Sequence, residues 1–202
     1  MEANFLDEKY WDERYSNRSA TWDIGSISTP LKEYIDQLND KSISILIPGC
    51  GNAYEAEYLV EQGFTNITVI DISPRLVEAI NRKLENRNGA KVQVICGDFF
   101  KLAQHYDLVL EQTFFCALDP GLRKNYSDKM TEILQPTGKL VGVLFNRSFE
   151  NGPPFGGEKQ EYEKLFSDKF QIRRMEECYN SIGPRKGSEL FVIMEVRQLD
   201  AD

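Results

Sequence analysis

The sequence predicts an α/β protein in which short strands alternate with helices along a single domain, residues 1–202. Two apolar runs of strand length, Ile43–Ile47 and Asn66–Ile70, flank a stretch of good helix formers, Ala53–Gln62. A glycine turn, Gly49-Cys50-Gly51, joins the first run to that helix. Ligands of α/β proteins bind outside the carboxyl ends of the strands, so we expect a site at this turn.

Composition and charge narrow the function classes. The net charge of −8 argues against nonspecific nucleic-acid binding, which depends on Lys and Arg neutralising phosphates. No apolar run approaches the ~18 residues of a membrane span, and the N-terminus is acidic and aromatic rather than a signal peptide. The four cysteines are widely spaced without a Cys-x-x-Cys pair, so we expect no metal site. We therefore expect a cytoplasmic protein, monomeric, that binds a small molecule.

The first 40 residues form a predicted arm that contains both tryptophans. Trp11 and Tyr15 are spaced to share one face of a helix, and Trp22 follows after a polar stretch. These rings can form a lid over a ligand, or they can simply pack the arm against the domain. The arm ends in a helix over 31–38, for which Thr29-Pro30 is a suitable start, with Thr29 as the cap.

The glycine turn departs from a dinucleotide-binding fingerprint. Tyr54 stands where Gly-x-Gly-x-x-Gly has its third glycine, and Glu55 and Glu57 occupy the first turns of the helix. Carboxylates at that position do not suit a pyrophosphate. The turn therefore indicates a nucleoside ligand without phosphate, and the alternative is a turn that binds nothing.

Acidic residues follow the next two strands. Asp71 ends the second strand about 20 residues after the glycine turn, the spacing of a ribose-binding carboxylate. The alternative role, capping the helix that begins at Pro74, is better served by Ser73. Asp98 and Phe99 follow the third strand and could contact a base, or Asp98 could cap a short helix. The later elements are expected as a strand over 106–110, a helix over 121–134, a strand over 139–145, a helix over 158–166, and strands over 170–176 and 190–196.

In this order the motifs resemble those of class I S-adenosylmethionine-dependent methyltransferases. More closely, the chain resembles the thiopurine methyltransferase family, especially its plant-type halide and thiol methyltransferase branch. The stretches that carry the resemblance span almost the whole chain: Trp11–Tyr15, Trp22–Asp23, Leu46–Gly51, Ile70–Ser73, Gly97–Phe100, Tyr106–Leu118, Leu134–Gly138, Gly152–Phe155 and Ile182–Gly187. The resemblance implies a Rossmann-like sheet of seven strands, mostly parallel with a reversed last hairpin, helices on both faces, and the N-terminal aromatic arm.

The resemblance also implies which residues bind the methyl donor, S-adenosylmethionine, which leaves as S-adenosylhomocysteine. The arm would supply rings, Gly49 would lie near the methionine part, Asp71 would bind the ribose, Asp98 and Phe99 the adenine, and Gln112 the methionyl or sulfonium end. The donor set is Trp11, Tyr15, Trp22, Gly49, Asp71, Asp98, Phe99 and Gln112. Two positions depart from the plant branch, which usually has tryptophan at Tyr15 and an aromatic residue at Gln112.

The acceptor residues implied by the resemblance lie in the second half of the chain. Phe114 and Phe115 would form a dry wall at the point of methyl transfer, or they simply pack in the core. Arg123 would approach the acceptor, with a surface salt bridge as the alternative. Arg185 would meet an anionic acceptor, against the usual solvated turn charge. Glu111 either accepts hydrogen bonds from loop amides or contacts the donor's ammonium group.

Two functions follow from this reading. The first is a methyltransferase that acts on a small soft nucleophile, a thiol, a thiopurine or a halide ion. Transfer from a sulfonium is an in-line displacement that requires alignment of donor and acceptor. A thiolate or halide has no proton to lose, so no general base is expected, and His105 precedes a strand, at the wrong end of the sheet. The second function is a non-catalytic module that binds the donor or its demethylated product.

Overall fold

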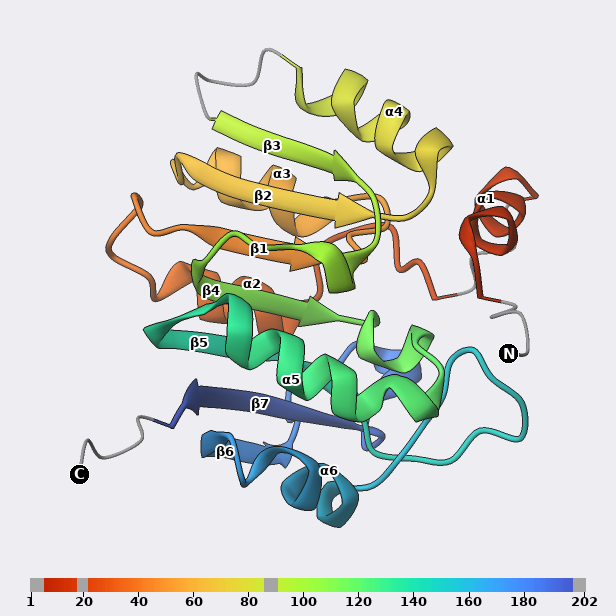
Figure 1. Cartoon of the computed structure of the whole chain (residues 1–202), viewed down its shortest axis with the longest axis vertical. Coiled ribbons are helices and arrows are strands. Elements are labelled where there is room, and N and C mark those ends of the chain that lie inside the picture. Colours follow the sequence, from red (N-terminus) through yellow and green to blue (C-terminus); the bar gives the residue numbers. More distant parts are fainter. Residues whose placement is uncertain (1–5, 18–21, 86–90, 198–202) are drawn as a thin grey trace.

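The computed structural model describes residues 6–17, 22–85 and 91–197 (Figure 1). Its strands form one sheet in the order β3-β2-β1-β4-β5-β7-β6. The pairs from β3 to β5 are parallel, whereas β7 runs antiparallel to both β5 and β6. This confirms the predicted α/β class with its reversed last hairpin. The strands are β1 Ile45–Pro48, β2 Asn66–Asp71, β3 Lys91–Cys96, β4 Tyr106–Gln112, β5 Leu134–Phe145, β6 Phe170–Glu177 and β7 Glu189–Val196.

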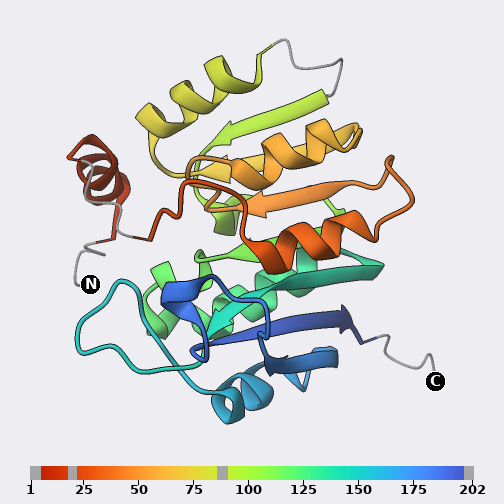
Figure 2. The same ribbon diagram turned by 180° about the vertical axis from the view of Figure 1, so that it is seen from behind.

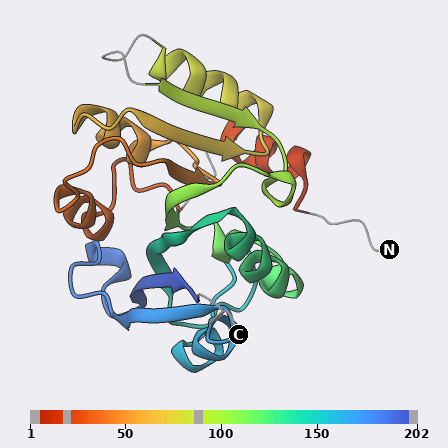
Figure 3. The ribbon, with the colours of Figure 1, turned by 60° about the vertical axis from the view of Figure 1, so that its left-hand side comes forward.

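Helices cover both faces of the sheet (Figures 1 and 2). Apolar side chains of α2, α3 and α4 pack in one hydrophobic cluster, and those of α5 and α6 pack in a second. Figure 3 shows α2 and α5 on opposite sides of the strands. The helices are α1 Glu8–Ser16, α2 Thr29–Asp36, α3 Tyr54–Glu61, α4 Pro74–Leu84, α5 Arg123–Ile133 and α6 Lys159–Phe166, with short 3-10 turns at Phe99–Lys101, Phe115–Ala117, Pro120–Leu122 and Gly183–Arg185.

The strand order reverses between β1 and β4, and this is where the topology opens a crevice. β1 pairs with β2 on one side and with β4 on the other. The strands that follow β1 in sequence are thus added first on one side of it and then on the other. The carboxyl ends of these strands point toward α1 in Figure 1. Ligands of open α/β sheets bind at such a reversal point, so the fold itself selects this edge as the site.

Local sequence explains the start of α4 but not that of α2. Ser73 caps α4 as predicted, because its Oγ accepts a hydrogen bond from the Leu76 amide at 3.2 Å and Pro74 is the first helical residue. The predicted cap of α2 was wrong. Ser28, not Thr29, is the residue before the helix, and its hydroxyl donates to the Gln112 side chain instead of capping. A contact with a distant strand thus overrides the local capping pattern.

The N-terminal arm lies against the carboxyl edge of the sheet. Of the predicted 1–40, residues 1–5 and 18–21 lie outside the described ranges, and the remainder contains α1 and α2. Within the described ranges, no helix combines the length and apolar character needed to cross a membrane.

Candidate functional site

A cavity of about 440 Å³ opens where β1, β2 and β4 end, in the size range of small-molecule sites. It is lined by the arm, the glycine turn, the residues that follow β2, β3 and β4, and parts of two later loops. All eight predicted donor residues line it, and so do two of the four predicted acceptor residues: Trp11, Tyr15, Trp22, Gly49, Asp71, Asp98, Phe99, Gln112, Phe114 and Arg185. Phe115 and Arg123 are not among its lining residues.

The three aromatic residues of the arm pack edge to face along one side of the cavity. The Trp11 and Trp22 ring centroids are 5.6 Å apart with planes at 83°, and those of Tyr15 and Trp22 are 6.0 Å apart at 89°. Edge-to-face pairs are the favoured geometry for aromatic rings. The rings therefore pack with one another and also line the cavity, so the two interpretations of the arm are compatible.

Side-chain hydrogen bonds fasten the arm around the cavity mouth. The Asp23 carboxylate accepts from the Asn52 amide, and from the Tyr54 hydroxyl at 3.4 Å. On α1, the Asp12 carboxylate accepts from the Ser73 hydroxyl. The arm thus contacts both the glycine turn and the start of α4, the two segments that flank the predicted nucleoside site.

The glycine turn is shaped by neighbouring rings. Gly49 has φ +54° and Gly51 has φ +52°, values that favour glycine. A Cβ on Gly49 would overlap the Phe114 ring, and a Cβ on Gly51 would lie 3.2 Å from the Tyr15 hydroxyl. The turn was expected to form part of a ligand site, and it does line the cavity. In the structure the missing side chains make room for two aromatic side chains of the protein itself.

Asp71 is the last residue of β2 and is 8% exposed. Its carboxylate accepts from the Ser73 amide at 3.0 Å and from the Gly51 amide at 3.3 Å. Burial raises the pKa of this carboxyl to about 6. A carboxylate has about four acceptor positions, of which the Ser73, Gly51 and Ile72 amides use about three, so capacity remains for at least one ribose hydroxyl. Ser73 serves the helix, as expected, and Asp71 ties the glycine turn to the end of β2.

Asp98 and Phe99 combine both of their proposed roles. The Asp98 Oδ1 accepts from the Phe100 amide at 2.9 Å and so caps the short 3-10 turn that follows. Phe99 is buried, and its ring lies edge to face with that of Phe114, with centroids 5.1 Å apart. Both residues still line the cavity. Their structural contacts hold them at the end of β3, where an adenine base is expected.

A residue that sequence reasoning passed over, Glu55, also lines the cavity. It was noted only as unfavourable for phosphate, yet it is buried and accepts a hydrogen bond from the backbone amide of Ser28. Burial raises the pKa of its carboxyl to about 7. The signal in the sequence was an acidic residue in the first turn of a helix directly after a glycine turn, but its burial depends on where the arm lies.

The ionisable residues that line the cavity are mostly acidic. Among the described residues that line the cavity, Arg185 is the only base, against six carboxyl groups: Asp7, Asp23, Glu55, Asp71, Asp98 and Asp119. Such a surface attracts cations. S-adenosylmethionine carries a sulfonium and an ammonium group, so the donor set fits this cofactor.

The end of β4 is fixed by Glu111 and Gln112. Glu111 is 1% exposed and accepts from the amides of Phe114 at 2.8 Å and Phe115 at 3.0 Å, and from the Tyr126 hydroxyl at 2.7 Å. Its carboxylate therefore orders the loop after β4, the structural role of the two considered; burial raises its pKa to about 7. Gln112 Oε1 accepts from the Ser28 hydroxyl at 2.7 Å, which leaves its amide N–H groups as the available donors.

The acceptor end of the cavity is mostly apolar. Its walls come from the loop after β4, the turn before α5 and the loop before α6: Phe114, Cys116, Ala117, Leu118, Leu122, Pro153 and Pro154. Phe115, predicted to form this wall, lies outside it. The ring is 1% exposed and packs against Tyr126 and Tyr162 in the core, with centroids 4.9 and 5.6 Å away.

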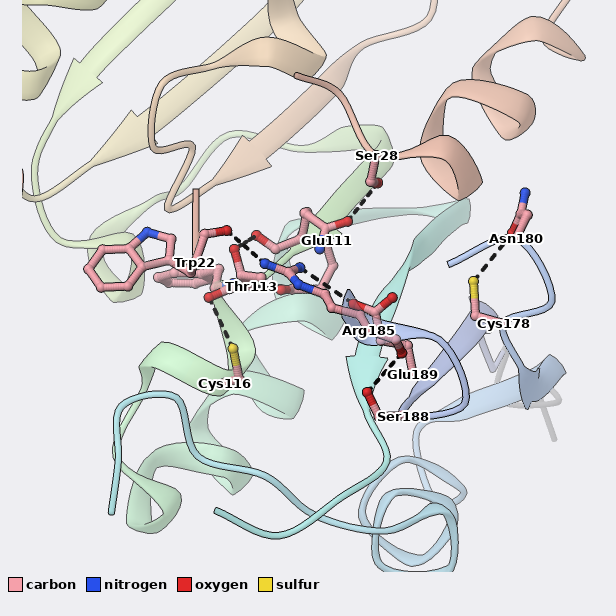
Figure 4. Close-up of polar contacts among 12 residues, drawn as sticks. Trp22, Ser28, Glu111, Thr113, Cys116, Cys178, Asn180, Arg185, Ser188 and Glu189 are labelled. Atoms are coloured by element: carbon pink, nitrogen blue, oxygen red, sulfur yellow. Dashed lines mark hydrogen bonds and ion pairs between the residues drawn. The ribbon is translucent and has the colours of Figure 1, made fainter. Parts of the chain in front are cut away.

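Of the two alternatives given for each arginine, the structure favours the ion pair for Arg123 and contradicts the solvated turn charge for Arg185. Arg123 is buried, forms an ion pair with Glu161 and donates to the Gly156 carbonyl at 2.6 Å, so its guanidinium joins α5 to α6 away from the cavity. The Arg185 side chain is only 11% exposed and not a solvated turn charge. It donates to the Trp22 carbonyl at 2.7 Å and lies 3.4 Å from Glu189 (Figure 4).

We find no metal centre among the described residues, and His105 is not placed to act as a base. Among those residues, no group of His, Cys, Asp and Glu is arranged to hold a metal ion. His105 is exposed and directly precedes β4. It therefore lies at the amino end of a strand whose carboxyl end forms the cavity.

Comparison with solved structures defines the class. The fold matches the magnesium protoporphyrin IX methyltransferase of Synechocystis PCC 6803, solved with S-adenosylhomocysteine, with a TM-score of 0.72 at 14% identity over 95% of this chain and 98% of that one. It matches the 1,6-didemethyltoxoflavin-N1-methyltransferase of Burkholderia thailandensis with a TM-score of 0.72 at 16% identity, over 95% and 87%. The fold is that of class I S-adenosylmethionine-dependent methyltransferases.

Sequence comparison defines the family. The profile of the thiopurine S-methyltransferase (TPMT) family matches residues 6–198. A probable thiol methyltransferase 2 of Arabidopsis thaliana is 30% identical over 186 residues, covering 89% of this chain and 81% of its own. The thiocyanate methyltransferase 1 of Brassica oleracea and the thiopurine S-methyltransferase of Nitrosospira multiformis are each 26% identical, over 91% and 83% of this chain and 83% and 84% of their own. The chain belongs to the thiopurine S-methyltransferase family and is an S-adenosylmethionine-dependent methyltransferase.

Proposed function

We propose that this protein transfers the methyl group of S-adenosylmethionine to the sulfur of a small thiol. The observation that carries the proposal is the apolar part of the cavity lining, which includes Phe114, Cys116, Leu118, Pro153 and Pro154. Soft, polarizable sulfur suits such a wall better than a hydroxyl or amine, which would lose hydrogen bonds to water there. The names of the three relatives, all concerning thiols, thiopurines or thiocyanate, agree with it.

The chain's own residues supply alignment and a suitable environment. S-adenosylmethionine, when bound, supplies the electrophilic methyl group. The carboxylates of Asp71 and Asp98 would hold its nucleoside part, and Gln112, which also lines the cavity, ends β4 directly before the loop that forms the apolar wall. Alignment of two reactants accounts for much of the rate of an in-line displacement. The apolar wall shields the acceptor sulfur. A thiol that enters uncharged releases its proton to water in the cavity. Its sulfur then bonds to the methyl carbon as the donor's sulfur–methyl bond breaks, S-adenosylhomocysteine leaves, and no base from the protein is required.

The electrostatics of the lining support a neutral organic thiol over a halide or thiocyanate ion as our proposed acceptor. Six carboxyl groups line the cavity, and the charge of Arg185 is shared with the buried Glu189. A free inorganic anion would enter against this field, whereas an uncharged thiol would not. Halide transfer stays the second candidate, because a bound sulfonium would add positive charge next to the acceptor.

An acceptor panel tests the proposal. Purified protein would be given S-adenosylmethionine with aromatic thiols, thiopurines, small aliphatic thiols, thiocyanate or iodide, and S-adenosylhomocysteine release would be measured. We expect kcat/KM to be highest for uncharged aromatic thiols and lowest for iodide. The Asp71→Ala variant serves as the control for donor-dependent turnover. Highest kcat/KM for an inorganic anion would overturn the thiol assignment, and donor binding without any turnover would favour a non-catalytic binding module.

A further inference from the structure

The loop between β6 and β7 reaches the N-terminal arm through Arg185. The arginine belongs to the short turn Gly183–Arg185, and its Nη2 donates to the carbonyl oxygen of Trp22 at 2.7 Å. Its Nη1 lies 3.4 Å from Glu189 Oε1, so the shorter contact goes to the arm and not to the acidic neighbour (Figure 4). Hydrogen bonds from a charged donor are shorter and stronger than neutral ones.

The loop that carries Arg185 is attached to the sheet. Glu189 is buried at the start of β7 and pairs with Phe145, the last residue of β5. The Arg185 guanidinium lies over the Phe145 ring, 5.4 Å from its centroid. The backbone of the turn is closed by hydrogen bonds from Arg185 N to Ile182 O at 2.9 Å and from Ser188 N to Arg185 O at 3.0 Å. The arginine is therefore held by the sheet, and the arm is the element that it positions.

Trp22 and its neighbour Asp23 are tied to opposite sides of the cavity. The Trp22 carbonyl is bound from the β7 side by Arg185, whereas the Asp23 carboxylate is bound by Asn52 and Tyr54 next to the glycine turn. Two consecutive residues thus span the cavity mouth. If the Arg185 contact is lost, the arm keeps its contacts with Asn52, Ser73 and Gln112, but the backbone at Trp22 is no longer held from the β7 side.

We propose that Arg185 is a positioning residue that holds the arm over the bound donor, so that the lifetime of the donor complex is set from the acceptor side of the sheet. The inference rests on the proposed function, because it requires donor binding in this cavity. It differs from an acceptor-binding role for Arg185, which would leave donor dissociation unchanged in the absence of acceptor.

The test measures donor dissociation without any acceptor. Trp11 and Trp22 are the only two tryptophans of the chain and both line the cavity, so their fluorescence reports the arm. S-adenosylhomocysteine would be displaced by excess S-adenosylmethionine, and the rate followed by stopped-flow fluorescence and by filter binding. For Arg185→Gln we expect dissociation faster by roughly tenfold, the usual worth of a hydrogen bond to a charged group. For Arg185→Lys, which keeps one charged donor, we expect partial rescue.

The neighbouring Lys186→Gln is the matched control, since Lys186 is exposed on the same turn and should leave the rate unchanged. An unchanged dissociation rate in Arg185→Gln, with a raised acceptor KM, would overturn the inference and leave the methyltransferase proposal intact. Absence of donor binding by the wild-type protein would instead contradict both. Should Arg185→Gln not fold, Arg185→Lys decides alone: faster dissociation supports the positioning role, and a wild-type rate contradicts it.

Discussion

The two ends of the cavity are built in different ways. At the donor end, Asp71 is the last residue of β2, Asp98 lies two residues after β3, and the glycine turn follows β1. At the acceptor end, the apolar wall comes from the loop after β4, the turn before α5 and the loop before α6, and Arg185 lies on a further loop between β6 and β7. Residues at strand ends are placed by the sheet itself, whereas loop residues are placed by contacts that no local pattern specifies.

The largest expected effect comes from a substitution at the donor end alone. Asp71→Ala removes the carboxylate that joins the glycine turn to β2 and that we assign to the ribose hydroxyls. We expect donor affinity to fall by about 100-fold, because the loss of a hydrogen bond from the ribose to a charged group is added to the loss of order in the glycine turn. Isothermal titration with S-adenosylhomocysteine measures this. A dissociation constant equal to that of the wild type would sink the ribose assignment.

A change of pH should alter donor affinity, because Asp71 at the donor end titrates. Burial raises the pKa of Asp71 to about 6, so the group is mostly protonated at pH 5 and ionised at pH 8. The ionised form is the better acceptor for hydroxyl groups, and donor affinity should therefore rise about tenfold between pH 5 and pH 7 and then level off. Titrations across this range would show the step, and Asp71→Asn should flatten it.

The raised pKa of Asp71 affects folding stability in the opposite direction: the free energy of unfolding falls as the pH rises. The folded protein binds the Asp71 proton more tightly than the unfolded chain, whose carboxyl has a pKa near 4. This contribution is fully present below about pH 4 and is lost as the pH rises to about 6. A donor-affinity profile that falls with rising pH would contradict the role given to the carboxylate.

A third change acts at the junction of the two ends. Glu111→Gln keeps the shape of the side chain but removes the charge that accepts from the Phe114 and Phe115 amides. The loop after β4 then loses order, and Thr113, with φ +61°, is less well held. We expect kcat to fall about fivefold, with donor affinity within twofold of wild type. Equal loss of donor affinity would show that Glu111 acts on the donor directly.

The smallest effect should be confined to the acceptor end. Leu118→Ala enlarges the apolar wall without touching the donor residues, and the lost apolar contact should raise the acceptor KM about threefold for an aromatic thiol. The donor dissociation constant should not change. Steady-state kinetics at saturating donor measure the KM, and Leu165→Ala, a partly buried residue on α6 outside the cavity lining, is the matched control.

What could be predicted from the sequence follows the same division. The strand and helix alternation, the Ser73 cap and the end of β2 at Asp71 are all local patterns, and the structure agrees with them. The burial of Glu55 and the bond from Ser28 to Gln112 depend on where the arm lies. Arg123 was expected at the acceptor, but its partners come from α6 and the preceding loop, more than thirty positions later.

The packing of the glycine turn also limits which substitutions the chain tolerates. Gly49 has room for no side chain because the Phe114 ring fills that space, and Gly51 similarly adjoins Tyr15. A smaller residue at position 114, which would widen the acceptor end, would clear that space, but the positive φ of Gly49 would still favour glycine. Across homologues, position 49 should therefore stay glycine where position 114 varies, so that the acceptor range can evolve without a change in the donor turn.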